Sequence, residues 1–222
     1  MSSSFLRFSS ITKKIWMALL GLFLIIFLLV HLSINLCLLR HDGGRWFNDA
    51  AYFMGTNYVV KVFELVLFAG FIFHICLGII LQVQNWMSRP VRYAVNNKSE
   101  TPFLSKYMIW TGGIIFVFLV IHLMNFYAIK LGWADGPRFA DGEPNFYQRA
   151  IDLFSHPAYS LMYILLFIVL GFHLNHAFQA AFQSLGLNFR KYTKCIEWFG
   201  VIYSIVVPIG FIIIPIYFLF IR

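Results

Sequence analysis

Five long apolar stretches alternate with short polar stretches along the chain. The apolar stretches cover residues 15–39, 58–86, 107–129, 158–183 and 196–220. A helix of about 20 residues or more crosses the roughly 30 Å hydrocarbon core of a bilayer, and each stretch is that long. The strands of a membrane barrel would alternate apolar and polar residues, whereas these stretches are almost continuously apolar. The pattern predicts an all-α membrane protein, a single domain of residues 1–222 with five transmembrane helices.

The polar stretches carry turn-forming residues and are predicted to be loops. They read "RHDGGRW", "MSRPVRYAVNNKSETP", "ADGPRFADGEPN" and "LGLNFRKYTK". Pro157 stands at the start of the fourth span, where the first helical turn tolerates proline. Pro208 and Pro215 lie inside the fifth span, where we expect a kink.

Composition supports a membrane protein and narrows its chemistry. The chain is 60% hydrophobic and only 12% charged, so a soluble core could not hold its apolar surface. Its three cysteines form neither a CxxC pair nor a CxxCH motif, so we expect no zinc knuckle and no covalently attached haem. In so apolar a chain the net charge of +8 reports membrane orientation, and no nucleic-acid partner is expected.

Loop charges predict how the chain sits in the membrane. The N-terminus and the second and fourth loops carry ten basic residues and two acidic ones: Arg7, Lys13, Lys14, Arg89, Arg92, Lys98, Lys106, Arg190, Lys191, Lys194, Glu100 and Glu197. On the opposite side the seven remaining basic residues are matched by seven acidic ones. Basic loops remain in the cytoplasm, so the N-terminus is expected there and the C-terminus outside.

Histidines are concentrated inside the first four spans, at His31, His74, His122, His173 and His176. A helix rises about 1.5 Å per residue, so distance along each span gives depth. His31 and His122 are about equally far from the outer ends of their spans. His74 and His173 share a second level, roughly 10 Å deeper. His176 has no counterpart at its own depth.

Four helices that each supply one histidine, paired at two depths, favour two six-coordinate haems. Neutral imidazole is a good ligand for haem iron, and two imidazoles fill both axial positions. The pairs are His31 with His122 for the outer haem and His74 with His173 for the inner haem. A lone membrane histidine can instead bond a carbonyl, line a proton path or bind a substrate. Glycines near these positions would let a flat porphyrin approach, although glycine also serves helix packing: Gly70, Gly78, Gly112, Gly113 and Gly171.

Two further polar residues inside the spans, His176 and Glu64, have candidate functions. His176 continues through Gln179 and Gln183 on one helix face, so we predict that it bonds a propionate or water beside the inner haem. Glu64 lies near the outer surface, where a carboxylate could exchange protons with a quinone. Alternatively it pairs with Lys61, three residues earlier on the same helix.

The spans resemble a known family in the order of these histidines. The relevant stretches are "SITKKIWMALLGLFLIIFLLVHLSINL", "HICLGIILQVQNW", "SKYMIWTGGIIFVFLVIHLMNF" and "GFHLNHAFQAAFQSLGLN". Over nearly its whole length the chain resembles the two-haem cytochrome b subunit of succinate:quinone oxidoreductase, the complex that is succinate dehydrogenase or fumarate reductase. The ligand-free fifth span also fits that family.

The resemblance implies a membrane anchor in the bacterial inner membrane that relays electrons through two b haems. His31 and His122 would bind the outer haem, and His74 and His173 the inner one. A flavoprotein subunit and an iron–sulfur subunit would dock on the cytoplasmic side and carry the dicarboxylate chemistry. The quinone, for which the resemblance favours menaquinone, would react near the outer side. Some of these fumarate reductases carry a proton-moving glutamate where this chain has Gly171, so that proton path is not expected here.

Two other functions were weighed. A cytochrome b subunit of a hydrogenase or formate dehydrogenase typically has four helices and other ligand positions, which the fifth span argues against. A histidine-containing transporter predicts charged or proline-broken helices near mid-membrane. The only carboxylate well inside the first four spans is Glu64, near one face, and the prolines within spans lie in the fifth.

Overall fold

A computed structural model describes residues 9–87, 107–187 and 193–221, and within these ranges it contains helices and no strand. Five helical runs are long and apolar enough to cross a membrane, which confirms the predicted spans. They are α1 (Ser10–Asn35) with the 3₁₀ turn η2 (Leu36–Leu39), α3 (Tyr58–Met87), α5 (Met108–His122) with η3 (Leu123–Tyr127) and α6 (Ala128–Lys130), α8 (Pro157–Ser184), and α9 (Thr193–Phe220). The loops "MSRPVRYAVNNKSETP" and "LGLNFRKYTK", with most of the basic residues that predict the orientation, lie largely outside the described residues.

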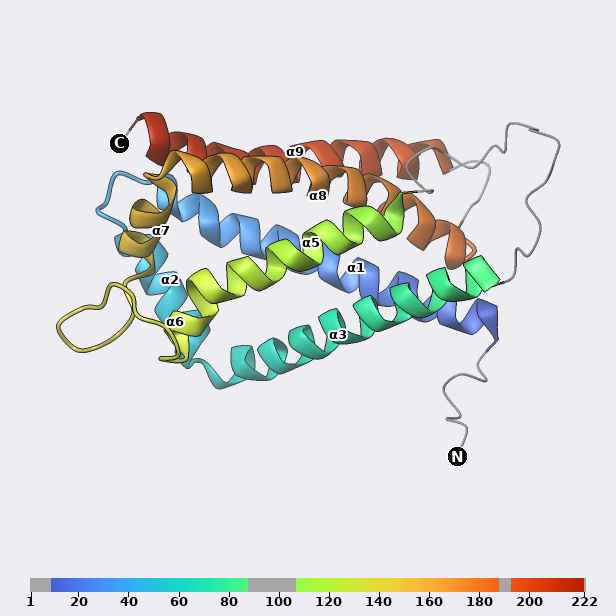
Figure 1. The fold of residues 1–222 in the computed structure, drawn as a ribbon, viewed down its shortest axis with the longest axis horizontal. Helices are drawn as coiled ribbons and strands as arrows, with labels where there is room; N and C mark the ends of the chain where they lie inside the picture. Colours follow the sequence, from blue (N-terminus) through green and yellow to red (C-terminus); the bar gives the residue numbers. More distant parts are fainter. Residues whose placement is uncertain (1–8, 88–106, 188–192, 222) are drawn as a thin grey trace.

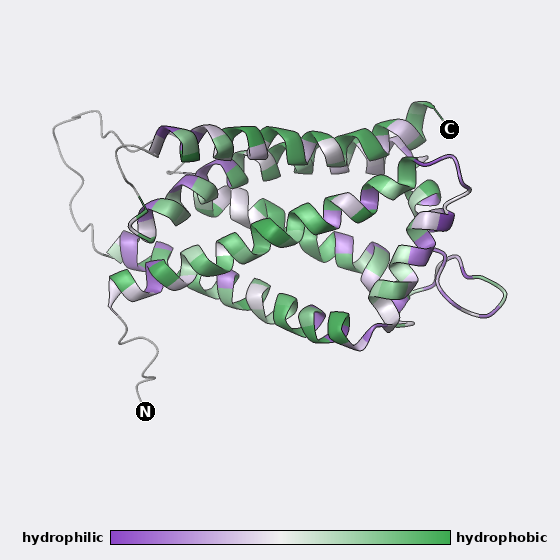
Figure 2. Cartoon of the chain, turned by 180° about the vertical axis from the view of Figure 1, so that it is seen from behind, coloured by the Kyte–Doolittle hydropathy of each residue, from purple (hydrophilic) through white to green (hydrophobic). Residues whose placement is uncertain are grey.

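The five long helices run roughly along the longest axis of the molecule, and the two termini lie at opposite ends (Figure 1). Helix α8 packs against α9, α1 and α5, while α3 packs mainly against α1 at the far edge of the bundle. Hydrophobic residues cover the lengths of these helices, and hydrophilic residues gather toward their ends (Figure 2). We call the end that holds the start of α1 the N-terminal end and the opposite end the C-terminal end.

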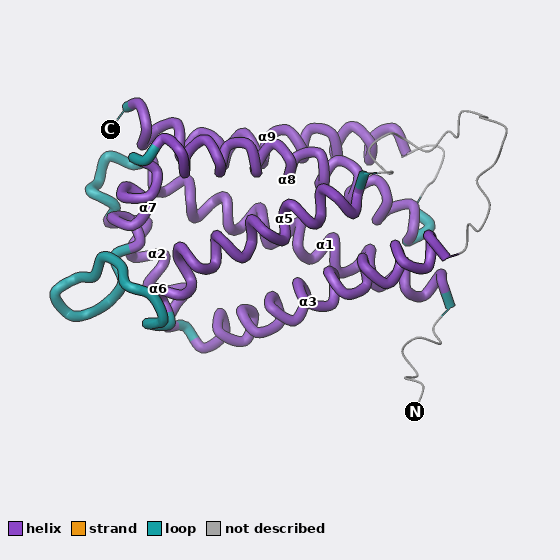
Figure 3. The backbone as a smooth tube through the Cα atoms, viewed as in Figure 1, coloured by secondary structure: helices purple, strands orange, loops and turns teal. Residues whose placement is uncertain are grey.

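Two short helices at the C-terminal end were not predicted from the sequence. They are α2 (Arg45–Thr56), which ends just before α3, and α7 (Phe146–Phe154), which follows α6 after the long loop of residues 131–145 (Figure 3). Asn48 ties them together, because its side chain accepts from the backbone N–H of Tyr147 at 3.2 Å and donates to Asn145 at 3.2 Å. The two segments are too short and too polar to cross a membrane, so span-length reasoning had left them unassigned.

The tightest helix pair is α8 with α9. On α8 the buried positions include 160, 163, 167, 170 and 174, and on α9 they include 200, 204, 207, 211, 214 and 218. Steps of three and four residues on both helices are the spacing of a coiled-coil seam. The chain stays helical through Pro208 and Pro215, and both prolines are buried within this packing.

Glycines let these helices approach closely. A Cβ atom at Gly171 would lie 2.9 Å from the carbonyl oxygen of Ser204, and one at Gly200 would lie 2.7 Å from the ring of Phe178. Ser204 is four residues before Pro208, which lacks the N–H that would normally bond that carbonyl. Gly171 therefore packs against α9 at a carbonyl whose usual helical donor is replaced by proline.

We predict that Gly171→Ala loosens α8 from α9. The added methyl group has no space beside Ser204, and overpacking of this kind costs about 1–3 kcal/mol. The measurement is the thermal unfolding midpoint in detergent, compared with Gly113→Ala, where nothing lies within 4 Å of the added carbon. Equal midpoints for the two variants would contradict the close contact at Gly171.

Candidate functional site

Four histidines lie on four different helices of the bundle. His31 belongs to α1, His74 to α3, His122 to the end of α5 and His173 to α8, and each is only partly exposed. In the described part of the chain, groups of three or more His, Cys, Asp or Glu side chains that could hold a metal ion are absent.

His31 and His122 face each other. Their ring centres lie 5.8 Å apart and their ring planes are inclined by 88°. Two imidazoles on opposite sides of one metal ion, each bonded at about 2 Å, have ring centres roughly 6 Å apart. The separation of the two ring centres is therefore close to that expected for two imidazoles on one metal ion.

Aromatic rings enclose this pair. Phe27 stacks on His31 at 5.3 Å, and Phe211 of α9 lies 5.8 Å from it. Phe118 and Phe126 flank His122 at 5.8 and 5.2 Å. These neighbours are apolar, as the surroundings of a porphyrin plane usually are.

Buried imidazole nitrogens at two of the four positions have no protein partner in the described ranges. They are Nδ1 of His74 and Nδ1 of His122. An unpaired buried polar atom is costly and uncommon, so it asks for an explanation. A role of these rings in binding a ligand from outside the chain supplies one.

The second pair, His74 and His173, lies against glycines of the neighbouring helices. A Cβ atom at Gly21 of α1 would come within 3.8 Å of Cε1 of His74. A Cβ atom at Gly112 of α5 would come within 3.5 Å of Cε1 of His173. His74 lies near enough to His173 for a charge on one ring to act on the other. Gly112 fits the role expected from the sequence, and Gly21 is a position that sequence reasoning missed.

The other glycines proposed from the sequence have different neighbours. Gly70 faces Phe23, Gly78 faces Met17, and Gly171 faces α9. A Cβ atom at Gly113 would have no neighbour within 4 Å. The closeness of glycine to histidine in sequence was therefore a poor guide, because facing residues come from different helices.

Thr111 determines which nitrogen of His173 is free. The Thr111 hydroxyl donates to the carbonyl of Met108 at 3.0 Å, and its oxygen lies 3.1 Å from Nδ1 of His173. Since the hydroxyl has one hydrogen and a carbonyl only accepts, Nδ1–H of His173 must donate to Thr111. Nε2 then keeps its lone pair, which is the form that binds a metal, and the hydrogen bond orients the ring.

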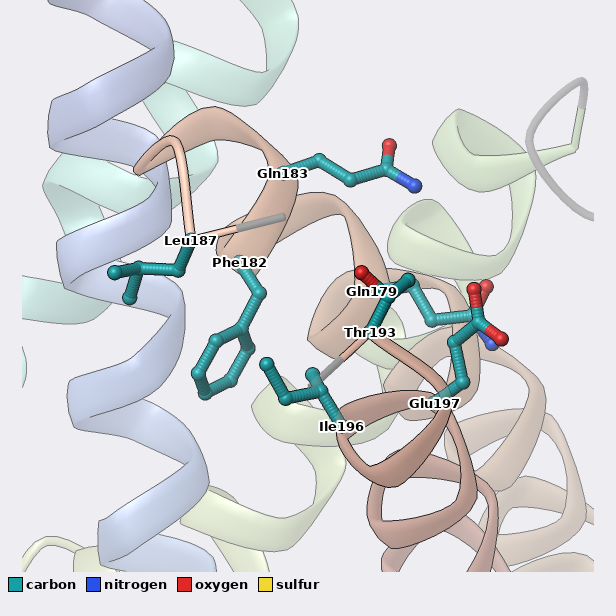
Figure 4. Close-up of a pocket in the computed structure, with 7 residues that line it drawn as sticks. All are labelled: Gln179, Phe182, Gln183, Leu187, Thr193, Ile196 and Glu197. Atoms are coloured by element: carbon teal, nitrogen blue, oxygen red, sulfur yellow. The ribbon is translucent and has the colours of Figure 1, made fainter. Parts of the chain in front are cut away.

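His176 lies within electrostatic reach of His173, one turn nearer the N-terminal end. The polar line that begins there continues into a small pocket between α8 and α9. Gln179 and Gln183 line this pocket with Thr193 and Glu197 of α9 (Figure 4). Gln179 also donates to Asn175 at 3.3 Å. The two glutamines thus line the pocket beside α9, while His176 lies one turn of α8 from His173.

Glu64 is held by two residues from the end of the third span. Tyr127 donates to its Oε1 at 2.5 Å, and Lys130 donates to its Oε2 at 2.6 Å. Lys61 instead stacks on Tyr58, with its Nζ 5.6 Å from the ring centre. The ion-pair partner of Glu64 is therefore Lys130, which α6 brings closer than Lys61; Lys61 acts on the carboxylate only through its charge.

The partners of Glu64 reach it through an unusual turn. Residues Leu123–Tyr127 form a π-helix, closed by a hydrogen bond from the N–H of Ala128 to the carbonyl of Leu123. One extra residue in a turn rotates all following side chains by roughly 100° relative to an uninterrupted α-helix. Lys130 comes three residues after Tyr127, so both side chains lie on the same helix face. After the π-turn, that face points at Glu64. No sequence signal marks a π-turn inside an apolar helix.

Comparisons of the chain with protein-family models, with curated proteins and with solved structures found no match.

The ion pair between Glu64 and Lys130 can be tested without any cofactor. Each side chain is about a quarter exposed, so removing one partner leaves a charge in a poorly solvated position. We expect Glu64→Gln and Lys130→Gln to be coupled by about 1–3 kcal/mol in a double-mutant cycle of thermal stability. Lys61→Gln is the control, and equal coupling of Glu64 to Lys61 would refute the assignment.

Proposed function

We propose that this chain is the membrane anchor and electron-transfer subunit of a succinate:quinone oxidoreductase. It would hold two b haems, with His31 and His122 binding one and His74 and His173 the other. When bound, each haem supplies a one-electron carrier between the iron–sulfur subunit and a membrane quinone. The observation that carries the proposal is the His31–His122 pair, whose ring separation of 5.8 Å suits two ligands of one iron.

The residues around the histidines support this proposal. Two histidines would hold each haem, which would favour electron transfer over oxygen binding. Thr111 holds His173 in the tautomer that ligates through Nε2, and Gly21 and Gly112 leave room beside the second pair. The order of the histidines in the sequence resembles that of the same family.

The Glu64 cluster is the proposed place of quinone chemistry. A carboxylate, a phenol and an ammonium group meet near the C-terminal end of the bundle. Quinone reduction and quinol oxidation move protons with the electrons, and a positioned carboxylate can donate or accept them. In this role Glu64 would exchange protons, and Tyr127 and Lys130 would position it.

The partners follow from the same proposal. A flavoprotein and an iron–sulfur subunit would dock at the N-terminal end, which the loop charges predict to be cytoplasmic. Dicarboxylate chemistry would take place on the flavoprotein. The cell membrane of a bacterium, with menaquinone or another quinone dissolved in it, is the expected location.

The spectrum of the purified chain provides the first test. We expect b-type bands in the reduced-minus-oxidised spectrum and two haems per chain. His74→Ala should retain one haem, His31→Ala should retain the other, and His156→Ala, at the start of α8, should retain both. A purified, folded chain without b-type bands would refute the proposal.

Thr111→Val tests how His173 is positioned. The substitution keeps the shape of the side chain and removes the hydroxyl that accepts from Nδ1. Loss of such a supporting hydrogen bond lowers metal-site affinity about 10-fold to 100-fold. We expect one of the two haems to be retained more weakly on dilution in detergent. Thr56→Val is the control, because the Thr56 hydroxyl donates to the carbonyl of Tyr52 within α2, away from the histidines.

A further inference from the structure

The π-segment Leu123–Tyr127 begins directly after His122. Turns of this kind are uncommon and occur mostly at functional sites. The orientation of the His122 ring depends on the backbone that follows it as well as on α5. Whatever holds the π-segment in place therefore contributes to holding His122 opposite His31.

Arg149 of the short helix α7 hydrogen-bonds to Asn125, the middle residue of this segment. Its Nε donates to the backbone carbonyl of Asn125 at 3.0 Å, and its Nη2 donates to the side-chain oxygen of Asn125 at 3.1 Å. The planar guanidinium fork suits two acceptors at once, which a lysine ammonium on its flexible stem does not. One side chain thus fixes both the backbone and the side chain of a π-segment residue.

Asn125 in turn contacts Tyr163, a residue beside His122. Asn125 Nδ2 donates to the hydroxyl of Tyr163 at 3.2 Å, and Tyr163 is only 1% exposed. The Tyr163 ring lies 6.4 Å from the His122 ring and 5.1 Å from Phe118, which also flanks His122. Arg149, Asn125 and Tyr163 therefore form a connected path from α7 to the His31–His122 pair.

The charge of Arg149 is not neutralised by any carboxylate of the described ranges within ion-pairing distance. The nearest acid on the same helix face, Asp152, accepts a hydrogen bond from Gln148 at 2.8 Å instead. Arg149 is also partly buried, so water screens its charge less than it screens an exposed arginine. A fixed positive charge favours the reduced form of a nearby redox centre, which carries one more electron.

We infer that Arg149 is a positioning residue for the His31–His122 site. It clamps the π-segment at Asn125 so that His122 faces His31, and its positive charge raises the reduction potential of the centre bound there. The inference rests on the proposed function for its redox part. The clamp itself is a property of the protein and can be measured without a cofactor.

The clamp is tested first by a double-mutant cycle on thermal stability. Arg149→Gln and Asn125→Ala should each lower the unfolding midpoint, and the double variant should fall by less than the sum of the two. Arg45→Gln is the matched control, since Arg45 is a highly exposed cation in α2 near the same end. Additive losses for Arg149 and Asn125 would overturn the clamp, whether or not the chain binds haem.

The redox part is tested by potentiometric titration and by the low-spin electron paramagnetic resonance signal of each haem. Arg149→Gln should lower the potential of one haem, the one that His31→Ala removes, and leave the other unchanged. Arg149→Lys keeps the charge and loses the fork, so it should alter the resonance signal of that haem with a smaller shift in potential.

Three results would overturn the redox part: unchanged potentials in Arg149→Gln, equal shifts of both haems, or an equal shift in Arg45→Gln. If Arg149→Gln does not fold, Arg149→Lys decides, because an unchanged resonance signal would refute positioning. A wild-type chain without haem would refute the proposed function and the redox part, and the stability cycle would still report on the clamp.

Discussion

Hydrocarbon offers no hydrogen bonds, so a polar side chain inside a transmembrane helix needs a partner from the protein or from a bound ligand. Glu64 meets Tyr127 and Lys130, and Tyr203 of α9 donates to the carbonyl of Ile25 in α1 at 2.5 Å. His173 meets Thr111. Each of these contacts joins two helices, so the polar residues inside the spans also link the bundle together.

Apolar packing supplies the frame in which these contacts form. The seam between α8 and α9 repeats every three or four residues and is tightened by Gly171 and Gly200. Helix α8 also packs against α1 and α5, and it carries both His173 and Tyr163. The position of α8 therefore sets both His173 and Tyr163, whose ring lies beside His122.

The π-segment links two regions of the C-terminal end that would otherwise be independent. Before it, His122 faces His31, and after it, Tyr127 and Lys130 face Glu64. In an uninterrupted α-helix the later residues would be rotated away by roughly 100°. One local change of backbone thus positions a histidine pair and a carboxylate cluster on different sides of the same helix. Arg149 holds this change of backbone from outside the membrane-spanning part.

Span number and approximate bounds followed from the sequence because a run of about 20 apolar residues has one stable solution in a bilayer. The closeness of His31 to His122 agrees with the equal depths expected from the sequence, because a helix converts residue number into height. The sequence did not predict helices α2 and α7. Nor did it predict the π-segment or the Glu64–Lys130 pair. Helices that are apolar on all sides give no periodicity to show which face is buried, and so only the tertiary structure decided that Gly171 faces α9 and Gly21 faces His74. The pairing of side chains across helices depends on rotation about each helix axis, which a sequence of almost uniform hydrophobicity does not encode locally.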